Sequence, residues 1–107
     1  MPKRLKRLLS LLNKRKALIE IKAVYSGVVQ GVFFRSSIKR HADMLHVEGT
    51  VRNTSDGKVE LFAIGEKKLL EKLLGDILNE PGAARISHVE KVFVVPCHQY
   101  KGFQVIY

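Results

Sequence analysis

The segment that ends at Arg35 carries the residues best suited to bind an anion. A β-branched strand pattern runs into a loop with Gly27 and Gly31, and a helical pattern opens at Phe34 with Arg35 in its first turn. The first N–H groups of a helix lack an intrahelical acceptor, and the helix macrodipole adds roughly half a positive charge there. A guanidinium binds two phosphate oxygens at once, and a helical side chain leans toward the start of its helix. We therefore expect an anion site with Arg35 above the loop.

A second pattern lies around Asn53, eighteen residues after Arg35. Asn53 ends an expected strand, and Asp56-Gly57 is typical of a tight turn. If this strand runs parallel to the one before Gly27, with a third strand between them, their C-terminal ends share one rim of the sheet. The two ends would then lie about 10 Å apart, so the two patterns would form one site.

Together the two patterns resemble the signatures of the acylphosphatase family. The first signature is Gly, any residue, Val-Gln-Gly-Val, two further residues and Arg, and it is intact from Gly27 to Arg35. The second signature is matched at six positions and departs at Thr50, where the family usually has an aromatic residue. The matched positions are Gly49, Val51, Asn53, Gly57, Val59 and Gly65. The resemblance covers residues 18 to 107.

The resemblance implies an enzyme that hydrolyses the carboxyl–phosphate bond of acyl phosphates without a metal. Arg35 and Asn53 are the expected catalytic residues, with Arg35 on the phosphate and Asn53 on the attacking water. The expected phosphate-binding loop comprises Val29, Gln30, Gly31, Val32, Phe33, Phe34 and Arg35. Gln30 is expected to brace this loop.

Independent chemical reasoning favours the same substrate class. The rim has no obvious nucleophile or general acid, and no carboxylate cluster suits magnesium. Ser36 and Ser37 have no activating base and are expected to cap the helix. His41 and His46 lack metal-ligand spacing. An acyl phosphate needs no acid, because its carboxylate leaving group has a conjugate-acid pKa near ~4. We therefore predict no cofactor and no metal.

The expected order of elements is βαββαβ with a terminal strand. Apolar stripes predict helices over 34–45 and 66–78, both on one face of an antiparallel sheet. The expected strands are 17–26, 46–53, 58–64, 88–95 and 101–106. This order predicts a ferredoxin-like α+β sandwich, the fold that the resemblance also implies.

Charge divides the chain of 107 residues into a basic extension over 1–16 and a domain over 17–107. The extension has seven Lys and Arg and no acid, whereas the domain carries only +2 of the total +9. The charge is therefore poor support for nucleic-acid binding by the domain. Leucines at helical spacing leave three interpretations of the extension: a docked helix, an arm for membrane surfaces or polyanions, or disorder.

The single cysteine, Cys97, cannot form an intrachain disulfide and predicts a cytoplasmic protein with a packed thiol. Catalysis by Cys97 is disfavoured, although His98 is its neighbour. No segment approaches the ~20 apolar residues of a membrane span. We expect a monomer or weak dimer whose partner is a small acyl phosphate.

Three rival interpretations remain. Acylphosphatase-like domains also occur inside larger carbamoyl-transferring maturation proteins. An RNA-binding module uses a similar sandwich, but the central strands here supply only Tyr25 and Phe62 as aromatic platforms. The basic extension could instead direct the chain to a membrane or a protein partner.

Overall fold

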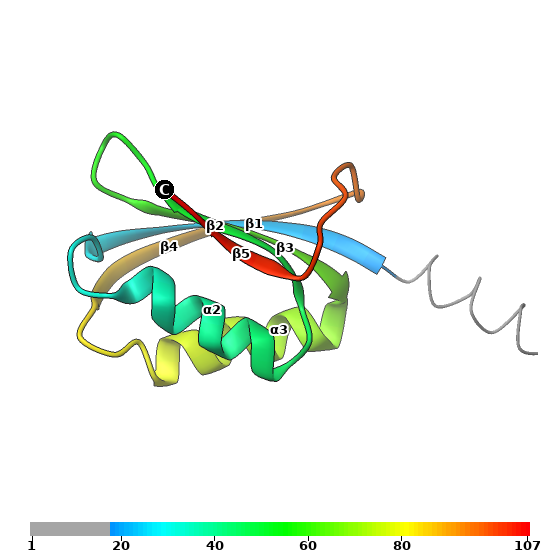
Figure 1. Cartoon of the computed structure of the whole chain (residues 1–107), viewed down its shortest axis with the longest axis horizontal. Helices are drawn as coiled ribbons and strands as arrows, with labels where there is room; N and C mark the ends of the chain where they lie inside the picture. The colour runs from blue at the N-terminus through cyan, green and yellow to red at the C-terminus, as the bar shows by residue number, and fades with distance from the viewer. Residues whose placement is uncertain (1–17) are drawn as a thin grey trace, which may run out of the picture.

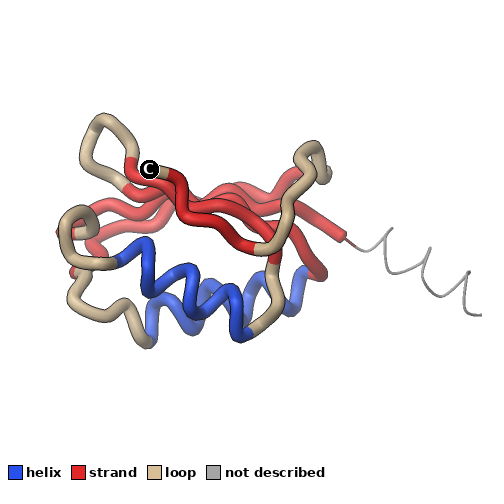
Figure 2. The backbone as a smooth tube through the Cα atoms, viewed as in Figure 1, coloured by secondary structure: helices blue, strands red, loops and turns tan. Residues whose placement is uncertain are grey.

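Five strands and two helices follow one another along residues 18–107, the part of the chain that the computed structural model describes. They are β1 (Leu18–Val28), α2 (Phe34–Met44), β2 (Glu48–Asn53), β3 (Val59–Glu66), α3 (Lys67–Asn79), β4 (Arg85–Val94) and β5 (Phe103–Ile106). The sheet forms one layer and both helices cover one of its faces (Figures 1 and 2). The predicted ferredoxin-like sandwich is confirmed. The predicted extension lies outside the described residues.

The strand order places the two sequence patterns at one rim of the sheet. The order is β4-β1-β3-β2-β5. Both β1 and β2 pair antiparallel with β3, so β1 and β2 run in the same direction with β3 between them. β5 adds to the far side of β2 as a parallel strand. The C-terminal ends of β1, β2 and β5 therefore point the same way, as predicted for the first two.

The core lies between the sheet and the helices because alternate strand residues point to opposite faces. In β1, Ile21, Ala23 and Tyr25 are fully buried, as are Ile38 of α2 and Leu73 of α3. Burying each large apolar side chain contributes roughly 1.5–3 kcal/mol. This packing fixes both helices against the sheet.

An aromatic contact joins the end of β1 to the start of α2. The rings of Tyr25 and Phe34 meet edge to face, with their centroids 5.2 Å apart. Both side chains are buried. The helix start is therefore held in place next to the loop that carries the candidate phosphate site.

The boundaries depart from prediction where the backbone takes special conformations. β1 runs two residues further, to Val28, through an irregularity at Ser26 and Gly27. β2 starts at Glu48, because His46 adopts a left-handed φ of 54° and the Val47 amide donates to the Ala42 carbonyl at 2.9 Å. Residues 46 and 47 therefore end the helix rather than begin the strand.

Among the described elements, no helix covers the opposite face of the sheet. The segment between β4 and β5 (orange in Figure 1) crosses this face at the end where β1 begins. Glu20 of β1 and Phe62 of β3 point to this face and contact His98 of that segment. Within residues 18–107, neither helix has the length and apolar character needed to cross a membrane.

Candidate active site

The loop from Val29 to Phe33 brings the end of β1 to the start of α2. A side chain at Gly27 would meet the Arg85 carbonyl at 2.2 Å, so the close approach of β4 requires glycine there. Gly31 and Phe33 both adopt left-handed φ angles, 72° and 60°. Glycine takes such an angle freely, whereas for Phe33 it is strained. The left-handed conformation of Phe33 redirects the chain so that α2 begins at the next residue.

No side chain caps the start of α2. Phe33 is the N-cap residue, and it makes no side-chain cap hydrogen bond. The first helical bond runs from the Ser37 amide to the Phe33 carbonyl, at 3.1 Å. The expectation that the serines cap the helix is wrong, since the Ser37 hydroxyl lies 3.4 Å from the Glu80 carbonyl instead. The N–H groups of the first turn remain available to an anion.

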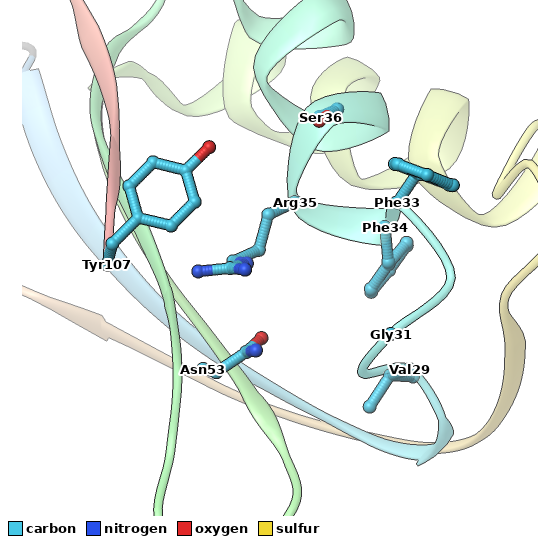
Figure 3. A pocket seen from close by; sticks show the side chains of 8 residues that line it. All are labelled: Val29, Gly31, Phe33, Phe34, Arg35, Ser36, Asn53 and Tyr107. Carbon is cyan, nitrogen blue, oxygen red and sulfur yellow. The ribbon is translucent and has the colours of Figure 1, made fainter.

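Arg35 lies on the side of the site formed by the C-terminal strand. One of its terminal nitrogens donates to the Ile106 carbonyl at 3.3 Å, and its Cζ atom is 4.6 Å from the centre of the Tyr107 ring. Its guanidinium is thus directed toward β5, and not back over the glycines as expected. It still lines the same pocket as the loop (Figure 3).

Asn53 enters the pocket from the end of β2. Its side chain and that of Arg35 point into the same space, with the loop on the other side (Figure 3). The Oδ1 atom of Asn53 is buried and has no hydrogen-bond partner among the described residues. Leaving a buried carbonyl oxygen without a hydrogen bond costs free energy. The Oδ1 atom of Asn53 is therefore a candidate to accept a hydrogen bond from a ligand in the pocket.

Gln30 ties the loop to the turn that follows Asn53. Its Nε2 donates to the Thr54 carbonyl at 2.9 Å and to the Lys58 carbonyl at 2.7 Å. The predicted bracing role is confirmed. The loop and the β2–β3 turn are therefore held as one unit, although they are more than twenty residues apart in sequence.

These groups line a pocket of about 430 Å³. Its lining residues are Val29, Gly31, Phe33, Phe34, Arg35, Ser36, Asn53 and Tyr107. Of the residues predicted to form the phosphate loop, Gln30 and Val32 do not line it. Among the described residues that line it, none has a carboxylate, imidazole or thiol side chain. The pocket therefore combines backbone donors, one cation and one carboxamide.

Sequence analysis missed Tyr107. It reaches the rim because β5 pairs parallel with β2, with Arg52 opposite Ile106. The residue as a whole is 94% exposed, and its ring lies against the Arg35 guanidinium. The sequence predicted the last strand but held no signal for its partner in the sheet.

Thr50 lies away from this pocket. Val51 is buried in the core on the helix side, so Thr50 points to the opposite, helix-free face. The departure from the family signature at this position therefore does not alter the lining of the candidate site.

A model of the acylphosphatase family matches residues 21–105. The chain belongs to the acylphosphatase family. It is 44% identical over 81 residues to an acylphosphatase from Alkalilimnicola ehrlichii, which covers 76% of this chain and 90% of that relative. It is 37% identical to an acylphosphatase from Archaeoglobus fulgidus, covering 84% of this chain and all of that relative. The expectation of a hydrolase of this class is confirmed.

Solved structures give the same result for the fold. An acylphosphatase from Coxiella burnetii superposes with a TM-score of 0.78 at 38% identity, covering 87% of this chain and 97% of that one. Full-length HypF, in a phosphate- and nucleotide-bound form, is also similar, with a TM-score of 0.77 at 25% identity. The alignment covers 84% of this chain but only 12% of HypF. The likeness to acylphosphatases thus extends over nearly the whole of the relative, whereas the likeness to HypF is confined to one part of it.

Proposed function

We propose that this chain hydrolyses acyl phosphates to a carboxylate and inorganic phosphate without a metal ion, using the pocket between the Val29–Arg35 loop and Asn53. The observation that supports this most is the meeting of a free helix start, one guanidinium and one carboxamide around a single pocket. Family membership supplies the reaction class.

The phosphate binds at the helix start and against Arg35. The N–H groups from the loop and the first helical turn donate to phosphate oxygens, and the helix dipole favours the negative charge. Arg35 uses one N–H on the Ile106 carbonyl and keeps its other donors for the phosphate. That bond and the Tyr107 ring hold the guanidinium in place, which lowers the cost of ordering it.

Asn53 positions the attacking water. Its Oδ1 accepts a hydrogen bond from the water, which satisfies the atom that has no partner among the described residues. The water oxygen then forms a bond to phosphorus while the bond from phosphorus to the acyl oxygen breaks. The carboxylate leaves as an anion, and the water proton passes to a phosphate oxygen.

The donor set of the pocket accounts for a reaction without metal or general acid. A carboxylate leaving group has a conjugate-acid pKa near ~4, so it needs no proton at neutral pH. Phosphoryl transfer depends mainly on positioning and charge stabilisation, which backbone amides and one guanidinium provide. Within residues 18–107, the lining offers no carboxylate or imidazole side chain to hold a divalent ion.

The cellular setting follows from the sequence. A single cysteine suits a reducing compartment, and we keep the cytoplasm as the predicted location. The partner is a small acyl phosphate, the domain does not bind nucleic acid, and the oligomeric state predicted is a monomer or weak dimer.

An assay of benzoyl phosphate hydrolysis by the chelator-treated protein tests this function. We expect full turnover in excess EDTA and no gain on adding magnesium. Activity that is absent in EDTA and restored by a divalent ion would contradict the proposal.

A further inference from the structure

Glu20, Cys97 and His98 form a second cluster, on the helix-free face of the sheet. The Oε2 atom of Glu20 lies 2.7 Å from Nδ1 of His98 and 3.7 Å from the Cys97 sulfur. The sulfur and the same Nδ1 atom are 3.4 Å apart. One oxygen, one nitrogen and one sulfur therefore surround a single point in space.

The cluster has one buried and two accessible members. The Glu20 side chain is only 1% exposed, whereas that of His98 is 52% exposed and Cys97 is also exposed. The His98 amide donates to Oε1 of Glu20 at 3.3 Å, which leaves Oε2 directed at the other two groups. The rings of Phe62 and Tyr100 lie 5.5 and 5.8 Å from the imidazole and restrict its orientation.

We propose that Glu20, Cys97 and His98 bind a Zn²⁺ ion or a related divalent transition-metal ion. Carboxylate, thiolate and imidazole are the ligands that zinc takes in proteins, at about 2.0–2.3 Å. Tetrahedral geometry at those lengths separates ligand atoms by about 3.3–3.7 Å. The two distances to sulfur already fit, and the Glu20–His98 distance must widen by less than about 1 Å.

Charge balance supports binding at this point. A carboxylate buried in a sheet face is costly unless a cation compensates it. Zn²⁺ with one carboxylate and one thiolate is a neutral site, and Cys97 releases its proton to solvent when the ion binds. The exposed side of Cys97 and His98 gives the ion a route in and leaves room for water as a fourth ligand.

A nucleophilic role for Cys97 fits the geometry less well. Reactive cysteines have a nearby cation or helix start that lowers the thiol pKa. Desolvation and the adjacent Glu20 carboxylate instead raise the pKa of the Cys97 thiol. A nucleophilic role is therefore disfavoured, whereas the three converging ligand atoms fit a metal ion.

The proposed role is structural and separate from hydrolysis. Glu20 lies near the start of β1 and the candidate active site begins after Val28, eight residues and about 26 Å further along the strand. A bound ion would join β1 to the segment that leads into β5. The sequence carries no signal for this site, because metal-ligand spacing is visible only between residues close along the chain and Glu20 is 77 residues from Cys97.

Absorption spectroscopy with Co²⁺ tests the proposal on the full chain after treatment with chelator. Residues 1–17 contain no Cys, His, Asp or Glu, so the extension adds none of these ligands. We expect a thiolate-to-cobalt charge-transfer band and tetrahedral d–d bands that Zn²⁺ removes at one equivalent. No such band in the folded wild-type protein would overturn the proposal, and hydrolysis in EDTA would be unaffected by that outcome.

Zn²⁺ competition with matched variants locates the site. Cys97→Ser should weaken binding about a hundredfold or more, since changes in supporting groups alone cost 10–100-fold. His88→Gln is the control, because His88 is an exposed histidine on β4, away from the cluster. Equal affinity in the wild type and Cys97→Ser, or an equal loss in His88→Gln, would show adventitious binding and overturn the assignment. Circular dichroism of each variant confirms that it is folded.

Discussion

The two ends of β1 lie beside groups of opposite electrostatic character. At its C-terminal end, the described residues of the pocket supply one cationic side chain, backbone donors and no acidic side chain, an arrangement suited to an anion. Near its start, a buried carboxylate lies against an imidazole and a thiol, an arrangement suited to a cation. One sheet can thus position groups suited to an anion at one end and groups suited to a cation at the other, because different segments surround the two ends of β1.

The two ends also differ in how their parts are brought together. The proposed phosphate loop is a continuous segment, so its residues carry a signature in the sequence. The second cluster joins residues 77 positions apart, and only pairing of the sheet and the path of the segment after β4 bring them together. A site made from one segment is therefore visible in sequence, whereas one made by tertiary contact is not.

Arg35→Ala should have the largest effect, because it removes the only side-chain cation that lines the pocket among the described residues. We expect kcat/KM for benzoyl phosphate to fall more than about a hundredfold. This fall corresponds to a loss of transition-state stabilisation on the order of 3 kcal/mol or more. Steady-state kinetics measure it. The control is Arg40→Ala, an exposed arginine on the same helix. Near-normal hydrolysis by the Arg35 variant would show that the reaction does not take place in this pocket.

Asn53→Ala should lower kcat by about a hundredfold, the typical cost of misplacing a reacting group. Because its partner is water, the affinity for inorganic phosphate should stay nearly unchanged. Kinetics and phosphate binding are measured side by side, with Asn79→Ala, at the exposed end of α3, as the control. Equal loss of phosphate affinity in the Arg35 and Asn53 variants would contradict their division of roles.

Glu20→Gln should lower the stability of the fold by a change near the start of β1, at the end away from the pocket. It removes the charge of a buried carboxylate that accepts hydrogen bonds from the side chain and backbone of His98. We expect the free energy of unfolding in EDTA to fall by about 2 kcal/mol. Urea denaturation measures it against Glu71→Gln, an exposed glutamate on α3. An unchanged midpoint would show that the stability of this end of the sheet does not depend on the Glu20 carboxylate.

Gln30→Ala should have a smaller effect that links loop geometry to activity. It removes two bonds to the carbonyls of Thr54 and Lys58. We expect the free energy of unfolding to fall by about 1 kcal/mol, with a rise in KM as the loop loses its brace. Denaturation and kinetics of one preparation measure both. A variant with wild-type KM would show that the loop holds its shape without Gln30.

Tyr107→Leu should have the smallest effect. It removes the aromatic face 4.6 Å from the Arg35 guanidinium but keeps an apolar side chain. Such a contact at an exposed site contributes about 0.5–1 kcal/mol, so phosphate affinity should fall two- to fivefold. Isothermal titration with inorganic phosphate measures it. A loss as large as that of Arg35→Ala would mean that Tyr107 contacts the ligand itself.

The sequence predicted the fold, and it predicted most of the residues that line the candidate pocket, because periodic patterns and two local signatures carry this information. The helix stripes placed α2 and α3 within about a residue, and the turn at Asp56-Gly57 separated β2 from β3. The left-handed turn at His46, just after the Leu45 cap of α2, escaped prediction because nothing local indicates its angle. The direction of Arg35 and the presence of Tyr107 depend on where β5 pairs, which a single sequence does not show.

The central claim is that backbone amides and one guanidinium hold the phosphate without a metal ion. Titration of ¹⁵N-labelled protein with inorganic phosphate in EDTA tests it directly, by following amide and guanidinium chemical shifts. The account predicts saturable shifts at residues 29–36 and at the Arg35 side chain, with none around Glu20. Absence of shifts in that loop, or shifts that need an added divalent ion, would contradict it.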